Sequence, residues 1–333
     1  MSYGDDPDLE RVADALGELA RREVPIGPLT TYRVGGSARV FCEPGSDAEL
    51  ARLVAALSGT AVPVLVIGKG SNLLVADRGW DGVCVHLGEH FAAIEVIQPG
   101  RPIEGGTPIA PVHPDATEVV AGAAAAYPVL ARRTAASGLA GLEWAVGIPG
   151  SVGGAVRMNA GGHGAETRDR LLGCRLVDLA AGTDRWVAAP ALELGYRHSA
   201  VGPSELVVAA RYRLDAGDAR ESSARISEIV RWRRENQPGG QNAGSVFTNP
   251  QNDSAGRLLD AAGLKGLRVG SASVSEKHAN FIQADVGGSA DDVRRLVEMV
   301  RQIVADRLGV ELAIELRMVG WDPSLERSDP SCS

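Results

Sequence analysis

Two glycine-rich stretches constrain this 333-residue chain more than any other feature of its sequence. The first, "VLVIGKGSNLLVAD" at residues 64–77, sets a glycine-flanked lysine and a Ser-Asn pair between two apolar runs. The second, "GIPGSVGGAVRMNAGGHG" at residues 147–164, sets Gly, Ala and Ser between apolar positions. Glycine lets a backbone approach a partner closely and leaves N–H groups able to donate. The stretches therefore indicate either ligand-binding loops or tight turns in a core of small residues.

The first stretch is not a Walker-type phosphate loop. That pattern requires GxxxxGK[ST] at the start of a helix, whereas Lys69 lies between the glycines and β-prone residues follow. Gly68 and Gly70 can still form an anion-binding nest, with Ser71 and Asn72 adding side-chain donors. A plain hairpin turn is the alternative. Together with the second stretch, this loop fits an elongated ligand with phosphates at one end and a ring system at the other.

Composition places the chain among ordinary soluble proteins of two or three domains, with 44% hydrophobic and 23% charged residues. The net charge of -8 argues against a protein that coats nucleic acid. The first residues lack a signal-peptide pattern, and no apolar stretch approaches the roughly 20 residues that span a bilayer. We therefore expect a cytoplasmic protein that binds neither nucleic acid nor membrane.

The four cysteines, Cys42, Cys84, Cys174 and Cys332, lie far apart and show neither CxxC nor zinc-finger spacing. This spacing predicts unpaired thiols in a reducing compartment and no metal site. The sequence also lacks a GxSxG elbow, an HExxH motif and a clear Ser-His-Asp order, which disfavours a hydrolase.

Periodicity divides the chain into three α/β units. A helix is predicted at residues 8–23, a strand interrupted by Gly-Gly at residues 28–44, and a second helix from residue 47 with Ser46 as its N-cap. The Pro- and Gly-rich residues 98–116 support no regular element for long, so we predict a surface insertion.

A charged helix at residues 221–236 opens the third unit. Apolar residues at helical spacing predict a further helix at residues 289–308 that ends at Gly309. Residues 310–320 alternate strictly and predict a strand with Glu315 on its polar face.

Several polar residues are candidates for chemistry, although each also has an ordinary structural explanation. The guanidinium group of Arg197 could bind a carboxylate or phosphate through two hydrogen bonds, but most single arginines are surface residues. Ser245 follows a glycine and precedes two apolar residues, as a serine in any tight turn does. His198 and His278 are typical polar loop residues, and Glu315 is typical of a solvated carboxylate.

Taken in order, the motifs resemble the UDP-N-acetylenolpyruvoylglucosamine reductase family, the MurB flavoenzymes of peptidoglycan synthesis. The matching segments are "TTYRVGG", "GKGSNLLV", "GLEWAVGIPGSVGGAVRMNAGGHG", "YRHS", "AGSVFTNP", "AGRLLDAAGLKGLRVGSASVSEKHANFI" and "IELRMVG". Each motif is weak alone, but their order and spacing together are highly specific.

The resemblance implies a mixed α+β and α/β fold: a three-domain flavoenzyme that joins a vanillyl-alcohol-oxidase/PCMH-type FAD-binding fold to a C-terminal substrate domain. Residues 20–88, with the chain end near 319–325, would form the first FAD-binding subdomain. Residues 89–217 would form the second, and residues 218–318 the substrate-binding domain. Disorder is expected at residues 1–10 and 326–333.

The resemblance also implies the reaction. NADPH, as co-substrate, would reduce a non-covalently bound FAD, and the reduced flavin would convert UDP-N-acetylglucosamine enolpyruvate to UDP-N-acetylmuramate. The protein would act as a monomer. The alternatives are another FAD-dependent small-molecule oxidase on a related fold, which often binds its flavin covalently, and a non-catalytic nucleotide-binding module.

Family roles transfer to matching residues of this chain. The FAD pyrophosphate would be held by Gly68, Gly70, Ser71 and Asn72, and the flavin would be lined by Ile148, Gly154 and Gly161. Arg197 and Glu315 would lie near the substrate carboxylate, with Ser245 as the proton donor. Asn249 and either Arg233 or Arg234 would hold the substrate or its diphosphate.

Two departures from the family pattern are visible. The segment "RLDAGDARES" at residues 213–222 is too short for the tyrosine-bearing loop of some members, which indicates the shorter subtype. His163 replaces the usual aromatic residue of a "GAYG" pattern.

Overall fold

The computed structural model describes residues 6–97 and 117–321, which divide into two compact units. Unit 1 contains residues 6–21, 40–69, 82–97 and 117–233, and unit 2 contains residues 22–39, 70–81 and 234–321. Each unit has a hydrophobic core of its own. The chain crosses between the units several times, so residues distant in sequence meet within each of them.

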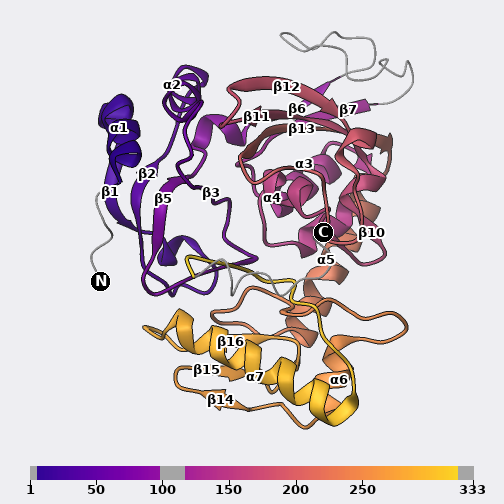
Figure 1. Ribbon diagram of the computed structural model, residues 1–333. Helices are drawn as coiled ribbons and strands as arrows, with labels where there is room; N and C mark the ends of the chain where they lie inside the picture. Colours follow the sequence, from indigo (N-terminus) through magenta and orange to yellow (C-terminus); the bar gives the residue numbers. More distant parts are fainter. Residues whose placement is uncertain (1–5, 98–116, 322–333) are drawn as a thin grey trace. The chain divides into compact units, whose positions relative to one another are not determined.

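The described residues form a mixed α/β fold (Figure 1). The helices are α1 Pro7–Leu16, α2 Asp47–Leu57, α3 Tyr127–Ala136, α4 Val152–Arg157, α5 Ala219–Asn236, α6 Ala255–Ala261 and α7 Ala290–Leu308. The strands are β1 Ala20–Pro25, β2 Ser37–Cys42, β3 Val64–Val66, β4 Leu73–Val75, β5 Trp80–Val85, β6 Ile94–Ile97, β7 Thr117–Gly122, β8 Leu139–Ala140, β9 Gly161–Gly162, β10 Ala165–Glu166, β11 Leu171–Asp178, β12 Thr183–Ala188, β13 Glu205–Ala216, β14 Arg268–Val269, β15 Ala272–Val274, β16 Ile282–Ala284 and β17 Arg317–Val319.

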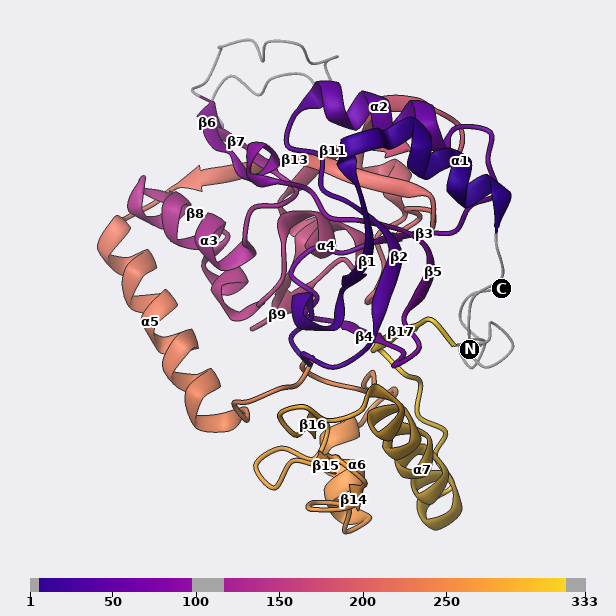
Figure 2. The ribbon, with the colours of Figure 1, turned by 90° about the vertical axis from the view of Figure 1, so that its left-hand side faces the viewer.

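A four-stranded sheet in the order β1-β2-β5-β3 carries the first glycine-rich stretch at the end of β3. Helices α1 and α2 lie side by side (Figure 2). Arg52 of α2 donates from Nη2 to the carbonyl of Leu16 at 2.8 Å, which satisfies one open acceptor at the end of α1. Ser46 caps α2 as predicted, because its hydroxyl accepts from the N–H of Glu49 at 3.2 Å.

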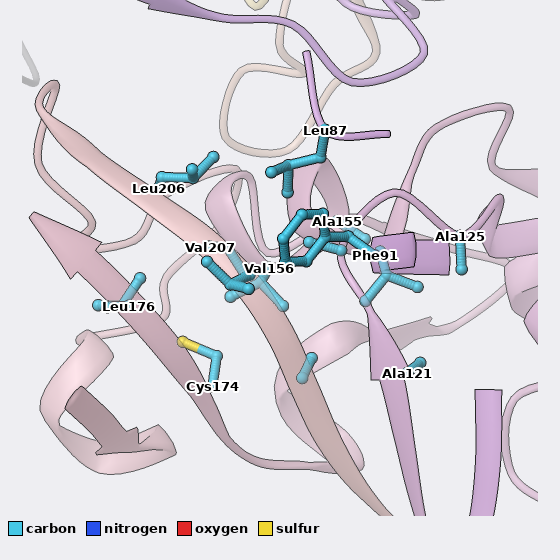
Figure 3. Close-up of a cluster of buried hydrophobic side chains, with 14 of the residues drawn as sticks. Leu87, Phe91, Ala121, Ala125, Ala155, Val156, Cys174, Leu176, Leu206 and Val207 are labelled. Atoms are coloured by element: carbon cyan, nitrogen blue, oxygen red, sulfur yellow. The ribbon is translucent and has the colours of Figure 1, made fainter. Parts of the chain in front are cut away.

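An antiparallel sheet in the order β12-β11-β13-β7-β6, with β8 paired to one end of β13, is the centre of unit 1. The helix α4 packs on β13. Figure 3 shows Val156 of α4 among Cys174 and Leu176 of β11 and Val207 of β13. Cys42, Cys84 and Cys174 are buried and form no disulfide, as the sequence predicted for these three.

Unit 2 is built on the antiparallel sheet β14-β15-β16, which α7 crosses (Figure 1). The predicted apolar stripe of α7, from Val293 to Val304, is fully buried. Gly309 ends the helix with a φ of 66°, as the sequence predicted. A separate pair joins β17 in parallel to β4, with Arg317 opposite Leu73.

Three predicted elements differ from the structure. The strand predicted at residues 28–44 is confined to Ser37–Cys42, and the chain before it begins with a short 3-10 helix at Gly27–Leu29. The first helix ends at Leu16 rather than residue 23, because Gly17 has a φ of 58° and residues 20–25 form β1 instead. The last strand is confined to Arg317–Val319, and Glu315 lies before it in extended chain. Residues 7–10, where disorder was expected, form the start of α1, while the predicted insertion at 98–116 lies outside the described residues.

None of the helices in the described parts of the chain is both long and apolar enough to cross a membrane.

Candidate cofactor and substrate site

The loop after β3 is tightly packed at both of its glycines. A Cβ atom on Gly68 would collide with the Ser151 hydroxyl and lie 3.2 Å from the Ser151 Cβ atom. Gly70 has a φ of 58°, and a Cβ atom there would lie 2.5 Å from the Leu29 carbonyl oxygen. Gly70 also accepts a hydrogen bond from the N–H of Thr31 at 3.1 Å. Both positions therefore require glycine for steric reasons.

The N–H groups of this loop are available to a ligand. Within the described residues, the carbonyls of Gly70 and Asn72 accept hydrogen bonds, but no N–H group from residue 68 to residue 72 donates one. Successive unpaired N–H groups in a glycine-rich turn form a concave site of positive potential that suits a phosphate. The chemistry of this loop thus fits the diphosphate of a dinucleotide such as FAD.

The second glycine-rich stretch packs against the first in unit 1. Ser151, which lies against Gly68, is the N-cap of α4 and accepts from the N–H of Gly154 at 3.2 Å. The side chain of Ile148 lies 3.6 Å from where a Cβ atom on Gly162 would be. The predicted phosphate loop and the predicted flavin-lining residues are thus joined at Ser151.

Arg197 lies at the tip of a tight turn and adopts a left-handed backbone, with a φ of 56°. Its Nη2 atom donates to the Gly161 carbonyl at 3.1 Å. Non-glycine residues in this conformation are uncommon and are concentrated at functional sites. The structure thus holds the predicted carboxylate-binding arginine against the predicted flavin-lining stretch.

Asn159 fixes this arrangement and was missed in the sequence. It is fully buried, and its Nδ2 atom donates to the Gly195 carbonyl at 2.7 Å and to Glu166 Oε2 at 3.0 Å. Its Oδ1 atom accepts from the N–H of Arg168 at 3.0 Å. The side chain therefore ties the glycine-rich stretch to the turn that carries Arg197. Its position in "RMNAGG" was the available signal, but a single asparagine in a loop is usually a turn residue.

His163 and Trp232 make an edge-to-face contact in unit 1, with ring centroids 5.2 Å apart. Burial lowers the pKa of His163, and the neighbouring charge of Arg233 lowers it further. Burial likewise lowers the pKa of Arg233. Arg233 thus carries a partly desolvated charge beside a neutral imidazole, an environment that strengthens binding of an anion.

Glu315 is held between two predicted functional segments of unit 2. Its N–H group donates at 2.8 Å to the carbonyl of Val246, the residue that follows Ser245 in the chain. Its carbonyl accepts from Asn72 Nδ2 at 3.0 Å. The backbone of Glu315 therefore connects the loop that carries Ser245 to the end of the glycine-rich loop.

Asn280 is a second residue that sequence reasoning missed. Its Oδ1 atom accepts from the N–H of Phe247 at 3.0 Å, and its Nδ2 atom donates to the Phe247 carbonyl at 2.8 Å. The Asn280 carbonyl also accepts from the N–H of Val246 at 2.9 Å. Both Asn280 and Phe247 are buried, so these bonds fix the segment that follows Ser245.

Ser245 and Asn249 line one cavity of about 450 Å³ in unit 2. Lys265, Lys277 and Arg257 line its wall together with Asp260, which pairs with Lys265 at 3.0 Å. Lys277 donates from Nζ to the Arg234 carbonyl at 2.6 Å, which ties the end of α5 to this wall. Burial lowers the pKa of His278, another lining residue. The cavity is polar and has more cationic than acidic side chains in its lining, which suits a phosphorylated ligand.

The predicted site residues thus fall into two groups, one within each unit. Unit 1 contains Gly68, Ile148, Gly154, Gly161, Arg197 and Arg233, and unit 2 contains Gly70, Ser71, Asn72, Arg234, Ser245, Asn249 and Glu315. Among the described residues, no group of three or more His, Cys, Asp or Glu side chains is placed to hold a metal ion.

Two family models match the chain. The one described as "FAD binding domain" matches residues 38–187. The one described as "UDP-N-acetylenolpyruvoylglucosamine reductase, C-terminal domain" matches residues 236–319. The first match covers both glycine-rich stretches, and the second covers Ser245, Asn249 and Glu315.

Curated relatives match over nearly their full length. The UDP-N-acetylenolpyruvoylglucosamine reductase of Acidiphilium cryptum is 45% identical over 92% of this chain and 94% of its own. The protein of the same name from Rubrobacter xylanophilus is 41% identical over 92% of this chain and 97% of its own. The crystal structure of UDP-N-acetylenolpyruvylglucosamine reductase (MurB) from Thermus caldophilus superposes with a TM-score of 0.74 and 34% identity, covering 90% of this chain and all of that one.

Proposed function

The chain belongs to the UDP-N-acetylenolpyruvoylglucosamine reductase family, and we propose that Arg197, Ser245 and Glu315 carry the substrate chemistry of that activity. The protein is an FAD-dependent oxidoreductase that reduces the enolpyruvyl group of UDP-N-acetylglucosamine enolpyruvate in peptidoglycan synthesis, with NADPH as co-substrate. When bound, FAD supplies hydride transfer from NADPH to the enolpyruvyl double bond.

The cofactor diphosphate would be held at the loop after β3. The unpaired N–H groups of residues 68–72, which include Gly68 and Gly70, support this assignment, and the hydroxyl of Ser71 adds a donor. Ile148, Gly154 and Gly161 would line the flavin from the second stretch. No His or Cys lies in "IGKGSN", so binding would be non-covalent.

The remaining chemistry is a proton transfer and the stabilisation of charge. Hydride addition to the terminal carbon of the enolpyruvyl group leaves an enolate conjugated with the carboxylate. Ser245 would give its hydroxyl proton to the enolate carbon, because a water-excluded site makes that carbon basic enough to accept it. Arg197 and Glu315 would stabilise the carboxylate oxygens by charge and hydrogen bonding.

The cavity of unit 2 supports the assignment of Ser245 as the proton donor. Ser245 and Asn249 share this cavity with Lys265 and Lys277, so a phosphorylated substrate anchored by the lysines would lie beside the serine hydroxyl. Arg233 or Arg234 would add a further charge to the diphosphate. This shared lining is the observation that carries the proposal.

Rapid mixing of Ser245→Ala tests the role of the serine, because flavin absorbance follows each half-reaction separately. Reduction by NADPH requires no proton on carbon, so we expect a rate near that of the parent. Re-oxidation by the enolpyruvyl substrate should slow by about 10² to 10⁴, the range for loss of a general acid. Ser245→Cys should retain more activity than the alanine variant, because a thiol still donates a proton.

Ser254→Ala is the matched control, because Ser254 lines the same cavity but caps α6 through the N–H of Arg257. We expect this variant to lose helix stability and to keep both half-reaction rates. Re-oxidation of Ser245→Ala at the parental rate would remove Ser245 from the mechanism.

We further propose that the protein acts as a cytoplasmic monomer with the three-domain boundaries predicted from its sequence. UDP-sugars and NADPH are cytoplasmic metabolites, and the buried free thiols of Cys42, Cys84 and Cys174 are typical of a reducing compartment. Light scattering coupled to size exclusion should give the mass of one 34.7 kDa chain. A mass of two chains would refute the monomer.

A further inference from the structure

The residues around Glu315 form a three-segment ladder in unit 2. On one side, Glu315 and Thr248 donate from their N–H groups to Val246 and Ala313 at 2.8 and 3.0 Å. On the other side, the N–H of Arg317 donates to the Asn72 carbonyl at 3.2 Å, where the parallel pairing of β17 with β4 begins. The segment that carries Glu315 therefore lies between the serine loop and the glycine-rich loop.

Asn72 extends this ladder by one step with its side chain. The pairing of β4 with β17 begins at Leu73 and Arg317, and it does not reach Glu315. The Asn72 Nδ2 atom reaches the Glu315 carbonyl at 3.0 Å instead. A substitution can remove this bond and leave the backbone pairing intact, which separates Asn72 from the rest of the ladder.

We propose that Asn72 is a positioning residue for the substrate half-reaction, acting through Glu315. This inference rests on the proposed function of Glu315 as a group that meets the substrate carboxylate. The Asn72 amide holds the Glu315 backbone in register with Val246, and so places the Glu315 carboxyl group relative to Ser245. Asn72 thereby connects the loop assigned to the cofactor diphosphate with the carboxylate site.

The alternative is that Asn72 serves only as a donor to the cofactor phosphates. An asparagine amide has two N–H donors, and in Asn72 one of them donates to the Glu315 carbonyl. A phosphate contact alone would affect cofactor affinity and both half-reactions together. A positioning role would affect the step that uses Glu315, because displacement of a catalytic group by about 1 Å costs on the order of a hundredfold in rate.

The test uses flavin-loaded Asn72→Ala and Asn72→Asp, both of which lack the donor. Thr31→Ala is the control, because the Thr31 hydroxyl donates to the Gly70 carbonyl of the same loop at 3.3 Å. We expect NADPH to reduce each variant within about threefold of the parental rate. Re-oxidation by the enolpyruvyl sugar nucleotide should slow about ten- to a hundredfold in both Asn72 variants. Re-oxidation of Thr31→Ala should remain within about threefold of the parent.

A double-mutant cycle with Glu315→Ala distinguishes positioning from an independent effect. If Asn72 acts through the Glu315 carboxyl group, then adding Asn72→Ala to Glu315→Ala should change re-oxidation less than twofold. Equal slowing in both backgrounds, equal slowing of both half-reactions, or loss of flavin from both Asn72 variants would each overturn the proposal. A parent protein that its substrate does not re-oxidise would instead refute the proposed function.

Discussion

The contact between Gly68 and Ser151 predicts a large effect from a single methyl group. The φ of Gly68 lies outside the left-handed range, so alanine is compatible with its backbone. The added Cβ atom would nevertheless lie less than 3.0 Å from the Ser151 hydroxyl oxygen. Cβ atoms are essentially never found that close to another heavy atom. Gly68→Ala must therefore displace either the loop after β3 or the first turn of α4.

Two costs set the magnitude. Overpacking by one methyl group costs about 1–3 kcal/mol. Movement of Ser151 would break its hydrogen bond to the N–H of Gly154, and loss of a helix N-cap costs about 0.5–2 kcal/mol. If the loop moves instead, its N–H groups leave the phosphate, and the overpacking cost of about 1–3 kcal/mol corresponds to FAD binding weakened about 5- to 150-fold.

Titration of the apoprotein with FAD, followed by quenching of flavin fluorescence, measures this change. Ser151→Gly is the control and the rescue, because glycine removes the colliding atoms and is only a few tenths of a kcal/mol worse as an N-cap. The double variant Gly68→Ala/Ser151→Gly should bind FAD within about threefold of Ser151→Gly alone. An unchanged Kd in Gly68→Ala, or no recovery in the double variant, would refute the reasoning.

Two further predictions concern unit 2. Asn280→Ala leaves the buried N–H and carbonyl of Phe247 without partners and should destabilise the unit by about 2–5 kcal/mol in urea unfolding. Asn242→Ala, whose bonds are exposed or only partly buried, should cost less than about 1 kcal/mol, and equal losses would contradict the argument. The N–H and hydroxyl of Ser271 both donate to Asp292 and lower its pKa, so the stabilisation from this carboxylate is complete at neutral pH and is lost as the pH falls through the folded-state value. The difference in Tm between the parent and Asp292→Asn should therefore narrow below about pH 4, and a difference that stays constant with pH would exclude the ionised form as its source.

Local sequence patterns predicted those helices and strands whose apolar periodicity and end residues lie within one continuous segment. The helix α7 has its apolar stripe, its Ser289 cap and its Gly309 stop within a single stretch of chain. The first helix was predicted too long because "ELARRE" contains good helix formers, and pairing within a sheet outweighed their propensity. The pairing of β17 with β4 joins segments more than 200 residues apart, and no local pattern specifies such a partner.

The residues of the candidate site also differ in how far the sequence could predict them. The glycine-rich loops were visible because their composition is unusual, and composition alone indicates close backbone approach. Arg197, Ser245 and Glu315 became candidates for particular roles only through the resemblance to a known family. Asn159 bonds to Gly195 and Asn280 bonds to Phe247, each more than 30 residues away in the sequence. The importance of both asparagines is therefore evident only once the fold brings those segments together.

Anaerobic titration of the purified protein tests the central claim most directly. The protein should be yellow, should bleach with one equivalent of NADPH per flavin, and should recover its colour when the enolpyruvyl sugar nucleotide is added. Acid denaturation should then release all of the flavin. A protein that binds no added FAD, or one whose NADPH-bleached flavin is not re-oxidised by the enolpyruvyl sugar nucleotide, would contradict the account.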